Sequence, residues 1–118
     1  MILVDTSVWV DHLRNKNNEL EQLLNNGNVV CHQFIIGEIA CGNIKNRSLI
    51  ISLLLELPQI VCINFDEILI FIEKNDLIGK GLGFIDVHLL GSAVLHNVRL
   101  WTLDNTLSYH ADRLGIGY

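Results

Sequence analysis

Four acidic side chains either follow an apolar segment of the sequence or lie within one. They are Asp5, Glu38, Asp86 and Asp104. Asp5 directly follows the apolar run Ile2-Leu3-Val4, and Asp104 comes just after the run Arg99-Leu100-Trp101. If both runs are parallel strands, both carboxylates project from the carboxyl edge of the sheet, where α/β folds bind their ligands.

Glu38 and Asp86 are lone charges in apolar segments that read as helices. Glu38 lies within residues 34–40 (FIIGEIA), and Asp86 lies within residues 83–87 (GFIDV). A lone charge in an apolar setting is expensive, so such a group is usually paired or bound to a metal. Each acid taken singly could instead be a helix cap or an ion-pair partner. Four acids in such positions weaken that alternative.

A cluster of four carboxylates would be held together by a cation, because like charges repel. Oxygen ligands suit hard ions, which points to Mg²⁺ or Mn²⁺. Such ions support phosphodiester hydrolysis: one activates a water molecule and another stabilises the leaving oxygen. The acids therefore predict a metal-dependent phosphodiesterase.

The elements that must position these acids can be read from the hydrophobic pattern. Strands are predicted at Ile2–Val4, Val29–Cys31, Ile60–Ile63 and Arg99–Trp101. Their continuous apolar character is typical of a parallel sheet buried on both faces. Helices are predicted at Ser7–Arg14, Glu19–Asn26, Gln33–Asn43, Arg47–Leu57, Asp66–Ile78, Phe84–His96 and Asn105–Leu114. The alternation predicts an α/β fold with helices on both sides of a mostly parallel sheet.

Length and hydrophobicity indicate one soluble domain. The 118 residues, half of them hydrophobic, suffice for a single domain spanning 1–118. The most apolar stretch, Leu49–Ile63, is interrupted by Ser52, Glu56 and Pro58 and falls short of the roughly 20 apolar residues that span a membrane. No basic segment precedes the first apolar residues, as it would in a signal peptide. We expect a cytoplasmic protein with no membrane partner.

The net charge of −5 argues against a nucleic-acid partner, because phosphate contacts need lysine and arginine. Thirteen acids stand against eight bases, but without the four proposed ligands nine acids remain. Two divalent ions would cancel the charge of the four ligands. The acidity then lies largely in the site itself, and RNA remains a possible substrate.

Cysteine and histidine spacing does not favour a second metal site. Cys31, Cys41 and Cys62 form no Cys-x-x-Cys pair, so we expect small buried apolar residues rather than a zinc site. His88 and His96 lie two turns, about 12 Å, apart on one helix, too far to share an ion. With Ser92 between them, they predict a polar stripe that faces solvent or an interface.

Three further side chains invite an RNA-binding interpretation. Trp9 and Trp101 could stack on bases, although core positions are favoured for both. Lys80 lies in the segment Gly79-Lys80-Gly81 just before Asp86, where a loop could contact an RNA backbone. A simple helix-ending loop explains that segment equally well.

Four segments resemble, in order and spacing, the motifs of PIN domains. They are Val4–Ser7, Gly37–Gly42, Gly83–Ala93 and Leu100–Asp104. The likeness covers the whole chain. Among PIN domains, this single short chain resembles the VapC-type toxins of toxin–antitoxin pairs.

This resemblance implies a three-layer α/β/α sandwich with a short, mostly parallel sheet of four to five strands. It implies a Mg²⁺- or Mn²⁺-dependent endoribonuclease that cuts tRNA or structured rRNA, leaving a 3′-hydroxyl and a 5′-phosphate. The four acids would be the catalytic metal ligands. Expected partners are RNA, a VapB-like antitoxin and a second copy in a homodimer. Candidate supporting residues are Thr6, Ser7, Thr102 and Asn105.

One departure from the family pattern concerns a second metal. Many PIN domains carry another acid shortly after the fourth motif, whereas here Asn105 follows and the next acid is Asp112. Asn105 could supply a neutral oxygen instead. The alternative function is a catalytically silent PIN-like module that binds protein or RNA. A phosphatase with a nucleophilic Asp5 would need a second acid at Ser7, so that alternative is poor.

Overall fold

The computed structural model describes all 118 residues and centres on a small parallel sheet. The strands are β1 (Ile2–Val4), β2 (Val29–Val30) and β3 (Arg99–Trp101), in the order β2-β1-β3. In the register of the sheet, Leu3 of β1 lies opposite Val30 and Leu100. β1 is fully buried, which explains its uninterrupted apolar sequence. Because neighbours on both sides flank β1, its carboxyl end is the switch point of the fold.

Seven helices surround this sheet. Their bounds are α1 (Thr6–Asn15), α2 (Asn18–Asn25), α3 (Gln33–Ala40), α4 (Arg47–Glu56), α5 (Phe65–Lys74), α6 (Phe84–His96) and α7 (Asn105–Arg113). Each overlaps a helix expected from the sequence. Asn17 and Asn64 cap α2 and α5 by accepting a backbone N–H, which fixes where these helices begin. None of the helices is long and apolar enough to cross a membrane.

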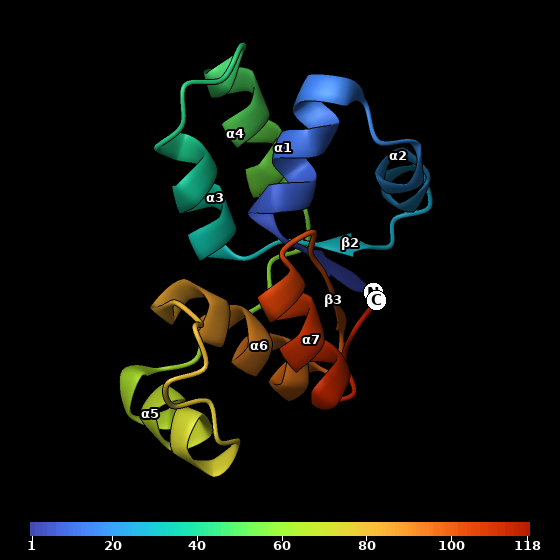
Figure 1. Cartoon of the computed structure of the whole chain (residues 1–118). Coiled ribbons are helices and arrows are strands. Elements are labelled where there is room, and N and C mark those ends of the chain that lie inside the picture. Colours follow the sequence, from blue (N-terminus) through green and yellow to red (C-terminus); the bar gives the residue numbers. More distant parts are fainter.

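The helices form layers on the two sides of the strands (Figure 1). α1 to α4 lie on one side, α6 and α7 lie on the other, and α5 packs outside α6. The two termini lie side by side, next to the amino end of β1 (Figure 1). The observed architecture is therefore α/β with a parallel sheet, as the sequence predicted.

The predicted number of strands is wrong: the sheet has three strands, not four to five. Residues 60–63 are not a strand, because pairing stops after the single bridge Cys31–Gln59. Cys31 has used its N–H and C=O on Pro58 and Ile60, and the next residue, His32, caps α3. No extended backbone remains beside residues 61–63. On the other edge, Gly117 makes one bridge, to Leu100.

Two of the three residues of the polar stripe of α6 are buried, which corrects the expectation that the stripe faces solvent or an interface. His88 and Ser92 are 4% and 0% exposed. The Ser92 hydroxyl lies 3.2 Å from Nε2 of His32, whose Nδ1 accepts the Phe34 N–H. α6 is covered on nearly every side, and Gly91 allows Ile63 to pack directly against its backbone. A polar stripe on such a helix must find partners inside the protein.

The tryptophans and cysteines divide between confirmed and wrong predictions. Trp9 and Trp101 are buried in the hydrophobic core, as expected. Cys31 is buried too, but Cys41 is exposed and Cys62 is partly exposed, so the prediction of three buried cysteines is wrong. Cys41 directly follows the last residue of α3 and is its C-cap.

Candidate active site

Asp5 is a buried carboxylate at the carboxyl end of β1 whose charge is held by two hydroxyl groups. Its side chain is 7% exposed. The Thr102 hydroxyl donates to Oδ2 over 2.7 Å, and the Ser7 hydroxyl donates to the same oxygen over 2.9 Å. No hydrogen bond within the protein engages Oδ1 of Asp5. One oxygen is therefore fixed while the other stays available to a ligand.

The same two hydroxyls hold the loop that follows β3. The Leu103 N–H donates to Oγ of Ser7 over 3.0 Å, and the Asp104 N–H donates to Oγ1 of Thr102 over 3.0 Å. Each hydroxyl thus donates to Asp5 and accepts from the loop. This arrangement couples the positions of Asp5 and Asp104, although 99 residues separate them in the sequence.

Asp104 is the N-cap of α7. Its Oδ1 accepts the Leu107 N–H over 2.8 Å, and its backbone is extended, as a cap requires. The side chain is exposed at the surface. Positive partial charge at the start of α7 stabilises the carboxylate in this position.

Glu38 is exposed and approaches the β1 end of the site through Thr6. The Thr6 hydroxyl donates to Oε1 of Glu38 over 2.8 Å, which links α1 to α3. Thr6 immediately follows Asp5 in the sequence, so the hydrogen-bond partner of Glu38 is the residue next to the switch point. Its expected apolar burial is wrong: Glu38 faces outward between the buried residues Ile36 and Ile39.

Asp86 lies in the first turn of α6 and is partly buried. Its Oδ2 accepts the Gly83 N–H over 3.1 Å. Burial raises the pKa of Asp86, and the negative charges of Asp5 and Asp104 raise it further, while the Gly83 N–H lowers it. The charges of Asp5 and Asp104 thus make a smaller contribution than burial to the raised pKa of Asp86.

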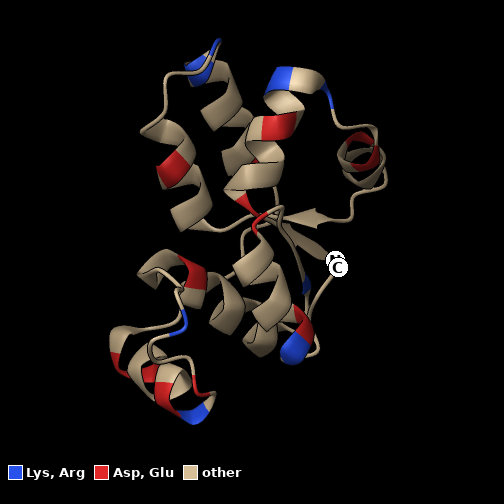
Figure 2. Ribbon diagram, in the orientation of Figure 1, with Lys and Arg blue, Asp and Glu red and all other residues tan.

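Hydrogen bonds join Asp5 to the Asp104 backbone through Thr102, the charges of both acids act on Asp86, and Glu38 lies beside them through Thr6. In Figure 2 the acidic segments after β1 and before α7 lie side by side, and lysines and arginines lie mostly at outer helix ends. Neither ion pair of the structure involves any of the four acids. No three acidic, histidine or cysteine side chains are already closed around a common point as they would be around a bound ion.

The four predicted supporting residues differ in their surroundings. Thr6, Ser7 and Thr102 all hydrogen-bond to the acids, as described above. Asn105, the first residue of α7, is exposed and makes no side-chain hydrogen bond. Three of the four therefore position carboxylates, whereas Asn105 has no such role in the structure.

The sequence matches the model of one known family, described as PIN domain, over residues 2–113. The chain belongs to the PIN domain family. Its relatives include Ribonuclease VapC32 of Mycobacterium tuberculosis, known from strains CDC 1551 / Oshkosh and ATCC 25618 / H37Rv. Each is 42% identical over 117 residues, which cover 98% of this chain and 94% of the relative.

An aromatic cluster beside Asp86 escaped the sequence analysis of this PIN domain. The ring of His88 packs edge-on against Phe84 and Phe34, with centroids 4.6 and 4.8 Å apart. Burial lowers the pKa of His88. The i, i+4 spacing of Phe84 and His88 on one helix was the available signal. The cluster fixes the first turn of α6, on which Asp86 stands.

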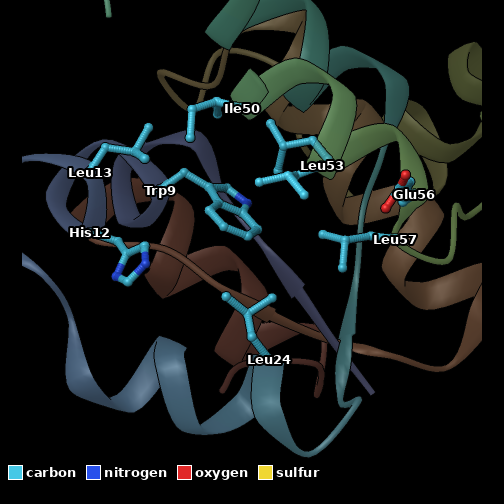
Figure 3. Close-up of a pocket in the computed structure, with 9 residues that line it drawn as sticks. Trp9, His12, Leu13, Leu24, Ile50, Leu53, Glu56 and Leu57 are labelled. Atoms are coloured by element: carbon cyan, nitrogen blue, oxygen red, sulfur yellow. The ribbon is translucent and has the colours of Figure 1, made fainter. Parts of the chain in front are cut away.

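A second feature of the PIN domain is an apolar hollow away from the four acids (Figure 3). It measures about 450 Å³ and lies between α1, the end of α2 and α4. Trp9 forms part of its wall together with exposed Leu13 and Leu53. The indole Nε1–H of Trp9 is buried and has no hydrogen-bond partner.

Proposed function

We propose that this chain is a Mg²⁺- or Mn²⁺-dependent endoribonuclease that acts as the toxin of a toxin–antitoxin pair. Its substrate is tRNA or structured rRNA, which places its action in the cytoplasm. The observation that carries the proposal is the hydroxyl network that joins Asp5 to Asp104 at the switch point, with Asp86 within reach of both charges. The relative named as a ribonuclease supports the same conclusion.

The residues of the cluster fit a hard divalent cation. Every candidate ligand is a carboxylate oxygen: Oδ1 of Asp5, and oxygens of Glu38, Asp86 and Asp104. Burial, and after it the negative charges of Asp5 and Asp104, raise the pKa of Asp86, and no lysine or arginine pairs with any of the four acids. A bound divalent ion would supply that compensation. When bound, it would also supply a Lewis acid and lower the pKa of a bound water.

The protein's own contribution is orientation. Ser7 and Thr102 hold Asp5 from one side, so that Oδ1 keeps its direction. Thr6 restrains Glu38, and the α7 cap restrains Asp104. Three acids are thus pre-positioned by short hydrogen bonds, which lowers the cost of organising the site when RNA arrives.

We infer that the apolar hollow seats an apolar segment of a VapB-like antitoxin. Trp9 and Leu13 lie on α1, the helix that begins one residue after Asp5, so Leu13 is about 12 Å along that helix from the acid. A partner seated in the hollow could therefore extend a tail over the site. Leu53→Glu should abolish antitoxin binding without affecting cleavage.

We propose that the chain forms a homodimer through the apolar face of α5. Phe65, Leu69 and Ile70 are each 47–64% exposed on this outer helix. A second copy would cover them. Sedimentation of Ile70→Lys beside the unaltered chain tests this: the variant should sediment as a monomer, and an unchanged dimer would place the interface elsewhere.

The test of the function is cleavage of total cellular RNA by purified, antitoxin-free protein. It is run with Mg²⁺, with Mn²⁺ and with chelator, beside Asp5→Asn. Discrete fragments with 5′-phosphate ends should appear with metal and vanish with chelator or with the substitution. Asp11→Asn, on α1 and outside the cluster, is the matched control and should cleave normally. A folded protein that cuts nothing with either metal would instead be a silent binding module.

A further inference from the structure

A small polar hollow lies where α7 meets the loop between α5 and α6. It measures about 230 Å³ and is lined by Asp76, Lys80, Tyr109, His110 and Arg113. None of these residues belongs to the acid cluster. The loop leads into the first turn of α6 with Asp86, and Asp104 is the N-cap of α7, so both walls of the hollow continue into the site.

His110 is a buried imidazole that has no partner in the protein. Its side chain is 6% exposed, its Nδ1 is buried and unpaired, and its Nε2 makes no hydrogen bond either. Buried polar groups normally have a partner, so an orphaned one needs an explanation. The neutral ring can donate from Nε2 to an acceptor that enters the hollow. Burial lowers the pKa of His110, and the positive charges of Arg113 and Lys80 lower it further.

Two cations flank this imidazole and have donors to spare. Arg113 donates one Nη2–H to the Asn75 carbonyl over 2.8 Å, which leaves most of its five N–H groups free. Lys80 is 3.6 Å from the carboxylate of Asp76, a largely exposed partner that cancels part of the charge. The hollow still carries one positive charge beyond Asp76. Three donor groups that line one hollow of net positive charge are suited to a phosphate.

Tyr109 adds an aromatic face beside these donors. Its ring is 64% exposed and meets the ring of His110 edge-on, with centroids 5.1 Å apart. Its hydroxyl makes no hydrogen bond, so nothing ties the ring down except packing against His110. An exposed ring next to a phosphate site is the pattern that binds single-stranded nucleic acid through base stacking.

We propose that this hollow, formed by Lys80, Tyr109, His110 and Arg113, is a subsite for one nucleotide of the RNA strand. Lys80, Arg113 and His110 Nε2–H hold the phosphate, and Tyr109 stacks on the base. His110 lies six residues along α7 from Asp104, about 9 Å along the helix, so the subsite is close to the bond that is cut but separate from it. The proposal rests on the ribonuclease function for the identity of its ligand.

The first test measures binding of a single-stranded RNA oligonucleotide by fluorescence anisotropy in chelator, where no cleavage can occur. Lys80→Gln should weaken binding about 5-fold and lower the slope of log Kd against log salt by about 0.7, the value for one lost phosphate contact. Lys16→Gln is the matched control, because Lys16 also lies 3.6 Å from a carboxylate, that of Glu21. The control should bind as the unaltered chain does.

Tyr109 tests the aromatic half of the subsite. Tyr109→Ala should weaken binding about 10-fold, whereas Tyr109→Phe, which keeps the ring, should bind normally. The Tyr109 side chain is exposed, so neither substitution should unfold the protein. Equal affinity of Lys80→Gln, Tyr109→Ala and the unaltered chain would overturn the subsite, whether or not the protein cleaves RNA.

A second measurement separates this proposal from the ribonuclease function. Inorganic phosphate is titrated into the chelator-treated protein while the imidazole signals are followed by ¹H–¹⁵N NMR. A saturable shift at His110 that is lost in Lys80→Gln would support the anion site even if the chain cuts no RNA. An unmoved His110 signal with phosphate and with RNA would refute the subsite while leaving any measured cleavage intact.

Discussion

Thr102 offers the sharpest test of how the site is organised, because one hydroxyl joins two acids. Thr102→Val keeps the volume and the branched shape of the side chain but removes the oxygen. Asp5 then loses a 2.7 Å hydrogen bond, and the Asp104 N–H loses its acceptor. A hydrogen bond to a charged group contributes about 1.5–3 kcal/mol and one between neutral groups about 1 kcal/mol.

The expected loss is smaller than the sum, because Asp5 keeps its bond from Ser7. We expect the free energy of unfolding to fall by about 2 kcal/mol in chelator, or roughly 8 °C in Tm for a domain of this size. RNA cleavage should fall at least 10-fold with metal present, since both carboxylates lose a positional restraint.

The assay pairs urea unfolding in chelator with RNA cleavage in Mg²⁺. Thr102→Ser, which keeps the oxygen, should recover most of both properties. Thr106→Val is the matched control. Thr106 lies nearby on α7, is exposed, and makes no side-chain hydrogen bond. If Thr102→Val unfolds and cleaves like the Thr106 control, the hydroxyl does not organise the site and the argument for coupled acids fails.

Three further outcomes are expected. Asp5→Asn should keep its circular dichroism spectrum and lose RNA cleavage; cleavage that survives would remove Asp5 from the site. Asp86→Asn should raise the free energy of unfolding in chelator at pH 7, because the raised pKa of Asp86 marks an ionised form that folding disfavours. That advantage should shrink as the pH falls through the pKa, and urea titrations that show no gain at pH 7 would contradict it. Burial, assisted by the charges of His88 and His96, lowers the pKa of His32 from 6.5 to about 4, so its contribution to stability is complete above pH 6.5 and is lost as the pH falls toward 4. His32→Asn keeps a capping side chain and should make the free energy of unfolding depend less on pH between 6.5 and 4. An unchanged pH dependence would exclude His32 as its cause.

The helices were predictable because their signals are local. Capping residues such as Asn17 and Asn64 and the break at Pro58 act within a few residues of each helix end. The strand expected at residues 60–63 failed because a strand also needs a partner, and β2 ends where His32 caps α3. A local apolar pattern contains no information on whether a neighbouring backbone is free.

The candidate site was likewise predictable only in part from the sequence. The positions of Asp5 and Asp104 at the ends of neighbouring strands follow from topology, which the alternation of elements predicts. The shared use of Ser7 and Thr102 depends on side-chain rotamers across 95 residues of sequence, which no spacing rule gives. The periodic spacing of His88 and Ser92 is also typical of a surface stripe, yet α6 is covered on nearly every side, and Ser92 lies beside His32 within the protein.

The hydrogen bond between Thr102 and Asp5 closes a loop of 97 residues, so it can form only late in the synthesis of the chain. Long-range contacts form late, because the entropy of loop closure must be overcome before they contribute. β1 gains its β3 neighbour only when the last sixth of the chain has been synthesised. A nascent chain on the ribosome therefore carries Asp5 without Thr102 and Asp104, and we expect it to gain nuclease activity only when its synthesis is nearly complete.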